Sequence, residues 1–535
     1  MMKHCKSGKS NFQKKYIMIT KKKYLLLVLS LFIFACSESN NNIIDPDIDE
    51  TVVNNTELND ATTLYGLITD DQNKAVSNIV VTDGFTTAKT DQNGVYQLVR
   101  NKKAKFVYYT TPSDCKIIVD EDNYPKFFER LISKDRKIRQ DFKVVKQAIE
   151  NEFTLLCVAD PQCRNAAEVS RYRSETIPDI NKLVSDKSYN NAYAITLGDI
   201  IFDAPNLWKE MKATMAKQSV PFFQVIGNHD HLETAPNDEK GVEGFQEMFG
   251  PTDYSFNRGN VHIISMDNVI YTGKQQYHGG FSESQLEWLK EDLSYVSKDK
   301  MVILCCHIPF RGGGSTDHTN TYYRQEVLNL LADYAEAHIM IGHTHYQINY
   351  LHNVKGKTIH EHVHGAACGA WWNSEWCADG TPNGYGVYEI QGNKVKNLYY
   401  KGTRQSTNFQ IRAYDASRAF GPANKYTYVF GAPANLNLVG DGWIVANIWN
   451  ADDRWSIKLF QDNTEVGSMT KVTSKDYWTL YHHLEELNKA IGSTFDRSAA
   501  HFYKGQLTGR TSEANFRIEA TDQFGNKYTT TLLQQ

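Results

Sequence analysis

Residues 152–160 read EFTLLCVAD, an apolar run that ends at a carboxylate, and four later segments repeat this design. Stretches of helical periodicity, such as SESQLEWLKEDLSYV at residues 282–296, separate the apolar runs. Buried strands that alternate with helices are typical of an α/β domain with a mostly parallel sheet. The four later runs are AYAITLGD (residues 192–199), PFFQVIGNHD (221–230), MVILCCH (301–307) and AHIMIGHTH (337–345).

The polar residues that end these five runs form a candidate site. In an open α/β sheet, ligands bind outside the carboxyl ends of the strands, so we expect the five ends to converge on one edge. They supply carboxylate, amide and imidazole groups, which are ligands of Mn, Fe or Zn. One Asp after a strand is commonplace, because Asp begins turns and caps helices, so the prediction depends on the whole ordered set. Its members are Asp160, Gln162, Asp199, Asn228, His307, His343 and His345.

In its order along the chain, this set resembles the calcineurin-like metallophosphoesterase family, whose pattern is D-x-H, GD-x-x-D, GNH-D/E, a lone His and GH-x-H. The match covers about residues 152–350. The resemblance implies a central two-sheet sandwich flanked by helices, with two divalent metal ions at the strand ends. It also implies a hydrolase that cleaves a phosphate mono- or diester through a dinuclear metal centre and a metal-activated hydroxide. The expected substrate is a phosphorylated small molecule, a nucleotide or a lipid headgroup.

The resemblance also assigns metal-binding roles, with one departure from the family pattern. Gln162 stands where the family usually has His, and its neutral amide oxygen favours a harder cation such as Mn over Zn. Asp199 would bridge the two metals. The first metal would be held by Asp160, Gln162, Asp199 and His345, and the second by Asp199, Asn228, His307 and His343.

The imidazole of His229 is expected to face the substrate without binding metal. It would protonate the leaving oxygen or stabilise charge on the phosphoryl group. Asp203 would orient His229, although it lies four residues after Asp199 where the family pattern has three. Asp230 is the alternative partner for this catalytic role.

Two loops supply candidate substrate contacts. Arg311 lies in the glycine-rich stretch HIPFRGGGSTDHTN, which is either a mobile lid or a plain surface loop. Trp371 and Trp372 lie in ACGAWWNSEWC, whose tryptophans either stack on the substrate or pack between domains.

The alternating His360, His362 and His364 of TIHEHVHG favour a partly exposed strand, with a third metal site as the alternative.

Residues 1–36 predict a lipoprotein signal peptide. A basic cluster, Lys21–Lys23, precedes an apolar run that is too short to span a bilayer comfortably. The sequence Ile33-Phe34-Ala35-Cys36 resembles a lipoprotein box in which Cys36 is acylated, with an uncleaved anchor or simple secretion as alternatives. Residues 37–62 are polar and acidic and read as a flexible tether. We therefore expect an exported lipoprotein, anchored in the membrane on the outer-membrane, periplasmic or cell-surface face.

The rest of the chain predicts a multidomain α+β protein. Turn dipeptides such as Asp83-Gly84 break residues 63–147 into hairpins, which indicates an N-terminal β-sandwich similar to carboxypeptidase-regulatory-like domains. Residues 148–402 would form the central α/β metallophosphatase domain, and residues 403–535 a C-terminal β-sandwich-like domain. The formal net charge of −4 lacks the basic excess typical of nucleic-acid binding, so no nucleic-acid partner is expected.

Export would permit disulfides, and two pairs of cysteines are close enough in sequence to form them. The candidate pairs are Cys157 with Cys163 and Cys368 with Cys377.

Two alternatives to the leading function remain. One is a two-metal hydrolase acting on a nucleotide pyrophosphate or a phospholipid headgroup ester, which the tryptophan-rich loop favours. The other is a lipid-anchored surface binding protein with a decayed metal site, which Gln162 favours.

Overall fold

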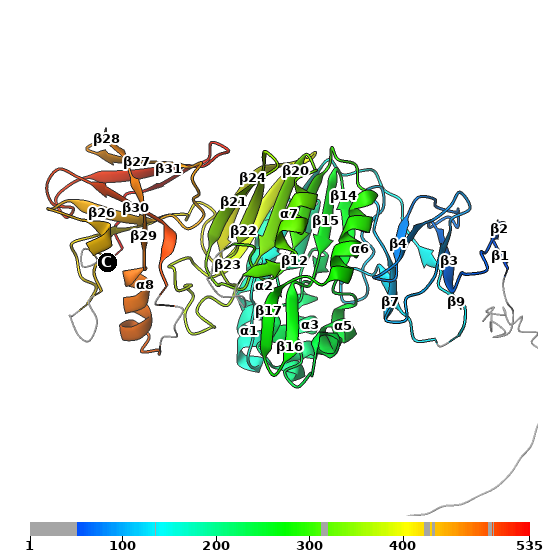
Figure 1. The fold of residues 1–535 in the computed structure, drawn as a ribbon. Helices are drawn as coiled ribbons and strands as arrows, with labels where there is room; N and C mark the ends of the chain where they lie inside the picture. Colours follow the sequence, from blue (N-terminus) through cyan, green and yellow to red (C-terminus); the bar gives the residue numbers. More distant parts are fainter. Residues whose placement is uncertain are drawn as a thin grey trace, which may run out of the picture. The chain divides into compact units, whose positions relative to one another are not determined.

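The computed structural model describes most of the chain beyond the leader (Figure 1). These residues belong to one compact unit, Glu50–Gln535. The predicted signal peptide, with Cys36, and the glycine-rich stretch 312–318 lie outside the described residues. No helix in the described part is long and apolar enough to cross a membrane. The described residues are 51–133, 135–311, 319–421, 428–430, 434–490, 495 and 497–534.

The N-terminal part is a small β-sandwich, as the turn dipeptides predict. Its two sheets have the strand orders β10-β3-β6, with β9 also paired to β3, and β5-β4-β7-β8. Apolar residues from both sheets, such as Leu64 and Val81, share one core. The strands are β3 (Leu64–Thr69), β4 (Val80–Thr82), β5 (Thr87–Lys89), β6 (Val95–Leu98), β7 (Phe106–Tyr109), β8 (Phe128–Arg130), β9 (Ile138–Arg139) and β10 (Phe142–Lys143).

The end of the predicted tether is ordered. Strands β1 (Val52–Val53) and β2 (Thr56–Glu57) form a hairpin before the sandwich begins. Val53 is buried against Tyr65 and Val95 of the sandwich, so an apolar contact holds this segment in place.

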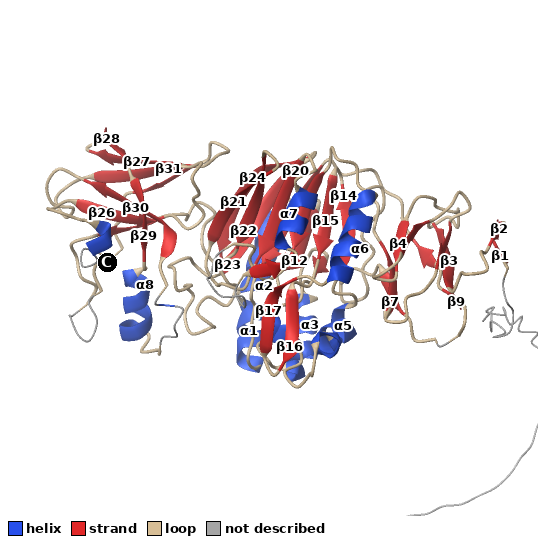
Figure 2. Cartoon of the chain, in the orientation of Figure 1, coloured by secondary structure: helices blue, strands red, loops and turns tan. Residues whose placement is uncertain are grey.

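The central part consists of two facing sheets with helices on both outer sides, which Figure 2 shows by colour. The first sheet has the order β13-β12-β11-β23-β24, and its strands β11 to β13 are parallel. Its members are β11 (Glu152–Val158), β12 (Ala192–Thr196), β13 (Phe222–Phe223), β23 (Gly384–Gln391) and β24 (Lys394–Gly402).

The second sheet has the order β14-β15-β18-β20-β22-β21. Strands β15, β18, β20 and β22 run parallel, and the two edge strands are antiparallel to their neighbours. A smaller sheet, β16-β17-β19, lies outside this order. The members of both sheets are β14 (Tyr254–Arg258), β15 (Val261–Ser265), β16 (Val269–Gly273), β17 (Gln276–Gly280), β18 (Met301–Cys305), β19 (Asn320–Tyr322), β20 (Glu336–Ile341), β21 (Ile348–Val354) and β22 (Lys357–Val363).

Three apolar clusters position these layers. Leu155 of the first sheet and Ile303 of the second belong to a shared core between the sheets. A second cluster joins the first sheet to α1, α2, α3 and α5, and a third joins the second sheet to α6 and α7. The helices are α1 (Ala166–Ser174), α2 (Thr176–Asp186), α3 (Trp208–Met215), α4 (Asp238–Gly241), α5 (Glu243–Phe249), α6 (Glu283–Ser294) and α7 (Arg324–Leu331).

The C-terminal part contains two further antiparallel sheets, β25-β26-β30-β29 and β28-β27-β31-β32. The predicted fold class is therefore confirmed, whereas the predicted domain boundaries stay predictions. The elements are β25 (Arg412–Asp415), β26 (Trp443–Asn447), β27 (Ser456–Gln461), β28 (Thr464–Ser468), β29 (Thr470–Ser474), α8 (Tyr477–Tyr481), β30 (Ala499–Gln506), β31 (Phe516–Thr521) and β32 (Lys527–Thr530).

The candidate disulfides are not formed, since the seven cysteines in the described part of the chain are all free and buried. Cys157 faces the core between the sheets, whereas Cys163 lies in the cluster under the helices. Their thiols are therefore packed in different layers. Cys368 and Cys377 are also free, and both lie in the cluster under the helices.

Candidate metal centre

The strand ends of both central sheets meet at one edge, as predicted. Nε2 of His307, just after β18, lies 3.3 Å from Oδ2 of Asp199, which follows β12. The same nitrogen lies 3.0 Å from Oδ1 of Asn228 and 3.1 Å from Nδ1 of His343. Ligand atoms of Asp199, His307 and His343 all lie within 4.8 Å of one another, which is the spacing that a bound metal ion requires.

The other candidate ligands surround the same place. Nε2 of His345 lies 3.5 Å from Oδ1 of Asp160, and the backbone N–H of His343 donates to both oxygens of that carboxylate. The Gln162 amide donates to Oδ2 of Asp199 at 2.8 Å. The structure thus brings all seven predicted ligands together, from segments nearly two hundred residues apart.

A buried atom without a partner tests whether these residues fit a metal. Oε1 of Gln162 is buried and has no hydrogen-bond partner, although such an atom costs about 1–3 kcal/mol when left unpaired. An amide oxygen beside carboxylates and imidazoles is an oxygen ligand of the kind Mn accepts. The residues present therefore fit divalent cations.

The tautomer of His307 also fits this role. Its Nδ1–H donates to the carbonyl oxygen of Leu197 at 2.7 Å, which leaves the lone pair on Nε2. That nitrogen is the one that faces Asp199, Asn228 and His343. Although burial raises the pKa of Asp199, the neighbouring imidazoles outweigh it and hold that pKa below its usual range.

The candidate ligands lie on strained backbone. Five of the seven have a positive φ, in the left-handed region that residues other than glycine rarely adopt. Each such residue costs on the order of 1–3 kcal/mol and persists where the surrounding structure fixes it, often at functional sites. The five are Asp160 (49°), Gln162 (43°), Asp199 (51°), His343 (72°) and His345 (59°).

Glycines let these segments approach one another. A Cβ on Gly227 would lie 2.2 Å from the backbone nitrogen of Asp199 and 2.3 Å from its Oδ1. A Cβ on Gly198 would lie 2.5 Å from Nδ1 of His307. Space alone therefore excludes a side chain at Gly227, whose φ of −118° is ordinary.

His229 lies beside this cluster and is held from several sides. Its backbone N–H donates to Oδ1 of Asp199 at 2.9 Å, and its Nδ1 lies 3.1 Å from Oδ2 of Asp203. The ring stacks on Phe202, with centroids 4.0 Å apart. Burial lowers the pKa of His229, but the carboxylates of Asp199 and Asp203 outweigh it and raise that pKa above its usual value.

Asp203, rather than Asp230, contacts the His229 ring. The buried carboxylate of Asp230 accepts hydrogen bonds from the backbone N–H groups of Ile200, Ile201 and Gly227. It therefore ties the turn after β12 to the turn after β13. Burial, and next the charge of Asp199, raise the pKa of Asp230 to about 7.

The three residues predicted to contact substrate lie in different surroundings. Arg311 is exposed and lies over the ring of Tyr350, 5.4 Å from its centroid. The Trp371 ring lies 4.6 Å from that of His345, beside the candidate ligands. Trp372 is buried and donates its indole N–H to the carbonyl oxygen of Pro161 at 2.9 Å, so it packs within the central part.

The third tryptophan of this loop packs on the C-terminal part. Trp376 lies 5.5 Å from Trp478 between ring centroids, and the Arg412 guanidinium lies 3.9 Å from its centroid. The two interpretations of the loop therefore apply to different residues. Trp371 lies beside the candidate ligand His345, whereas Trp372 and Trp376 are buried and serve packing.

His360 and His362 lie on β22 and His364 directly follows it; His360 is partly buried as expected, whereas the other two are more buried than expected. His362 and His364 are 1% and 0% exposed. Nδ1 of His364 lies 2.9 Å from the carbonyl oxygen of Ile341, and its Nε2 lies 2.8 Å from the hydroxyl of Tyr388. His362 similarly contacts His338 and Asn349. These nitrogens are occupied by protein groups, which argues against a third metal here.

Sequence reasoning missed Asn268. Its Oδ1 accepts hydrogen bonds from the backbone N–H groups of His307 and Ile308, and its amide donates to the carbonyl oxygen of Ile308. Asn268 therefore fixes the turn that carries His307. The only signal was a pair of polar residues, Asp267-Asn268, directly after an apolar run.

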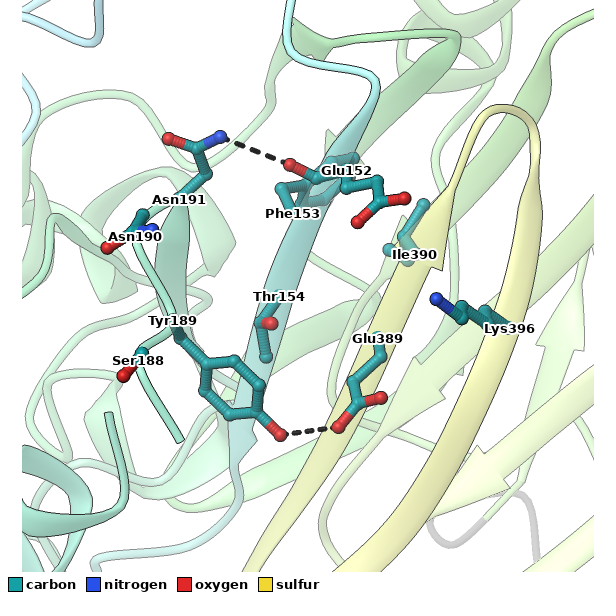
Figure 3. A pocket seen from close by; sticks show the side chains of 10 residues that line it. All are labelled: Glu152, Phe153, Thr154, Ser188, Tyr189, Asn190, Asn191, Glu389, Ile390 and Lys396. Carbon is teal, nitrogen blue, oxygen red and sulfur yellow. Dashed lines mark hydrogen bonds between the residues drawn. The ribbon is translucent and has the colours of Figure 1, made fainter. Parts of the chain in front are cut away.

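A separate cavity of about 220 Å³ lies at the opposite end of β11 (Figure 3). There Tyr189 donates its hydroxyl hydrogen to Glu389, and Asn191 donates to the carbonyl oxygen of Glu152. Because α/β sheets bind ligands at the carboxyl ends of their strands, this cavity lies away from the expected site.

Three models of one protein family match successive parts of the chain. The description "N terminal of Calcineurin-like phosphoesterase" matches residues 62–147, and "Calcineurin-like phosphoesterase" matches residues 153–347. The description "C terminal of Calcineurin-like phosphoesterase" matches residues 361–528. The central match contains all seven candidate ligands.

One curated relative comes from Arcobacter nitrofigilis and is named probable glycerophosphodiester phosphodiesterase GpdQ. It is 27% identical to this chain over 157 residues, which cover 28% of this chain and 55% of the relative. The chain therefore spans about half the length of that relative.

Similar solved structures include purple acid phosphatase PPD1 from yellow lupin (Lupinus luteus). It is 13% identical, has a TM-score of 0.33, and the match covers 48% of this chain and 55% of that one. Another is NAD nucleotidase from Haemophilus influenzae, at 12% identity, a TM-score of 0.27, and 47% and 49% of the two chains. Likeness at this level carries no argument about function.

Replacing Gly227 with alanine tests the crowding at the centre. Gly227→Ala would push a methyl group against the Asp199 backbone, and overpacking of this kind costs about 1–3 kcal/mol. We expect a lower melting temperature and a loss of bound metal, measured by thermal denaturation and elemental analysis. The control is Gly392→Ala, where a Cβ meets nothing within 4 Å and only the positive φ of 62° opposes the change, so this variant should keep its metal. Metal retention equal to that of the control would contradict the predicted crowding.

Proposed function

This chain belongs to the calcineurin-like phosphoesterase family, and from that premise we propose that it hydrolyses phosphate esters at a dinuclear metal centre. The observation that carries the proposal is the convergence of Asp199, His307 and His343. The unpaired oxygen of Gln162 in the same place supports it.

The ligands fall into two sets that share one carboxylate. Asp199 belongs to both sets, because its Oδ2 contacts Gln162 on one side and His307 on the other. One cation would be held by Asp160, Gln162, Asp199 and His345, and the other by Asp199, Asn228, His307 and His343.

Two divalent cations would neutralise the phosphate oxygens and lower the pKa of a water molecule to near neutral. The protein contributes the orientation of each ligand. Leu197 fixes the ring of His307 through Nδ1, and the backbone of His343 fixes the carboxylate of Asp160.

His229 is proposed as the general acid. Asp203 engages Nδ1, which leaves Nε2 to deliver a proton to the leaving oxygen. Phe202 stacks on the His229 ring, and the Asp199 carboxylate accepts a hydrogen bond from the backbone N–H of His229. A ring held in this way keeps its orientation without binding metal itself.

The substrate is proposed to be a small phosphodiester. The relative that matches part of the chain is named for glycerophosphodiester hydrolysis. Trp371, with its ring next to His345, offers a surface for an organic group attached to the phosphate. A phosphate monoester is the alternative outcome of the test below.

Export and acylation at Cys36 also remain proposals. They are supported by the basic cluster, the apolar run and the cysteine of the leader sequence.

Metal removal tests the proposal directly. Treatment of the protein with a chelator should reduce hydrolysis of bis-nitrophenyl phosphate to background, and added Mn should restore it. Mono-nitrophenyl phosphate should be the poorer substrate by kcat/KM. A protein that binds no metal under metal-replete conditions would instead be a binding protein with a decayed site.

Substitution of the proposed acid and its partner tests the role of His229. His229→Ala should lower kcat by about 10²- to 10⁴-fold, because that is the usual contribution of general acid–base catalysis. Asp203→Asn should lower it by about 10- to 100-fold, as substitutions of orienting partners do. His482→Ala, in the C-terminal part, serves as the control. Turnover by His229→Ala equal to the control would remove His229 from the mechanism.

The identity of residue 162 should set the choice of metal. Gln162→His would replace a hard amide oxygen with an imidazole, which suits Zn. We expect this variant to shift the competition between Mn and Zn toward Zn, measured by metal titration with elemental analysis. An unchanged Mn-to-Zn ratio would mean that Gln162 is not a ligand.

A further inference from the structure

A second cluster of potential metal ligands lies outside the seven proposed above. It forms where the turn after β13, the start of α4 and the segment between β15 and β16 meet. These supply His231, Asp238 and Asp267, whose ligand atoms all lie within 4.8 Å of one another. None of the three has a role in the proposed mechanism.

The orientation of His231 points to a ligand. Its side chain is 0% exposed, and its Nδ1–H donates to the carbonyl oxygen of Gly227 at 2.9 Å. The lone pair therefore lies on Nε2. That atom is buried and has no hydrogen-bond partner. It faces the carboxylates of Asp267 and Asp238.

The distances suit a shared cation better than direct hydrogen bonds. Nε2 of His231 lies 3.6 Å from Oδ2 of Asp267 and 3.8 Å from Oδ1 of Asp238. Hydrogen bonds from nitrogen to oxygen span about 2.7–3.2 Å. Two ligands bound about 2.1 Å from one zinc ion at a tetrahedral angle lie about 3.4 Å apart. A protonated His231 would form only long ion pairs with the two carboxylates at these distances.

The two carboxylates lie together in a partly buried place. Asp267 is 5% exposed, and its ligand atom lies within 4.8 Å of that of Asp238. Like charges this close repel one another, and a cation between them would relieve the repulsion.

Each of the three side chains is already oriented by a neighbour. The His231 ring stacks on Tyr271, with centroids 5.3 Å apart. Asp238 accepts from the backbone N–H of Tyr271, and Asp267 accepts from that of Val269, both at 2.9 Å. Metal ligands are commonly held by such contacts.

We propose that His231, Asp238 and Asp267 bind a third divalent cation of the Zn²⁺ class. One imidazole and two carboxylates supply three ligands, and water would complete the coordination. The Asp238 side chain is half exposed and lines a cavity of about 350 Å³, so one of the three proposed ligands is open to solvent.

This cation would brace the proposed catalytic centre without contacting substrate. The His231 ring is bonded to Gly227, directly before Asn228 and His229. Asp267 directly precedes Asn268, which fixes the turn of His307. One ion would therefore tie together two turns that carry proposed ligands and the proposed acid.

Metal counting in the full-length chain tests this site. Asp238→Ala removes one ligand at the surface, and Glu239→Ala is the matched control, because it removes the next acidic side chain of the same helix turn. After chelation and dialysis against Zn²⁺, we expect Asp238→Ala to hold one equivalent less than the control by elemental analysis. Zn²⁺ should also raise the melting temperature of the control more than that of Asp238→Ala. Equal zinc content in the two variants would overturn the inference.

A second pair of variants separates this site from the dinuclear centre, on which the proposed function depends. Asp199→Asn/His343→Asn disables that centre and should retain one equivalent of Zn²⁺, which a further Asp238→Ala removes. Retention of no zinc by a folded double variant would sink the third site. If the unaltered chain instead held a single equivalent that Asp238→Ala removes, the third site would stand and the dinuclear proposal would fail.

Discussion

Buried polar side chains from two sheets meet at one edge, and the rest of the central architecture accommodates this constraint. Buried carboxylates, amides and imidazoles cost free energy unless they are paired with each other or with a cation. The contacts of Asp199 with Gln162 and His307 offset part of that cost, while Oε1 of Gln162 stays unpaired. Left-handed turns at the ligands and a glycine at position 227 follow from the need to bring these backbones together.

The core between the sheets determines where the ligands meet. Asp160 and Asp199 follow strands of the first sheet, whereas His307 and His343 follow strands of the second. The apolar cluster between the sheets therefore fixes the distance between the two halves of the ligand set. Because protein cores are close-packed, a change of volume in that cluster would be felt at the ligands. Cations bound there would in turn link the two sheets at their open edge.

The strands and the meeting of the polar residues that end them could be predicted because they depend on residue order, which the sequence displays. What the sequence could not display was the direction in which neighbouring side chains point. Asp203 reaches His229 because its own φ is 50°, and spacing alone does not reveal that turn. The side chains of the adjacent Trp371 and Trp372 point in different directions, that of Trp371 toward His345 and that of Trp372 toward Pro161. Cys157 and Cys163 are close enough in sequence to be a candidate disulfide pair, but their side chains lie in different layers of the structure.

Contacts behind the ligands explain why so few residues suffice to hold the site. Asn268 holds the turn of His307 by accepting hydrogen bonds from its backbone N–H groups. Asp230 holds two other turns in the same way. Backbone contacts of this kind restrict a whole segment, so one buried side chain orients several ligands at once. Such residues are not part of the metal-binding motif, so the motif alone does not identify them. The His231 cluster has the same supporting position behind the candidate ligands, because it joins the turn of Gly227 to the segment that contains Asn268. The rigidity of the centre thus depends on these supporting contacts as much as on the ligands themselves.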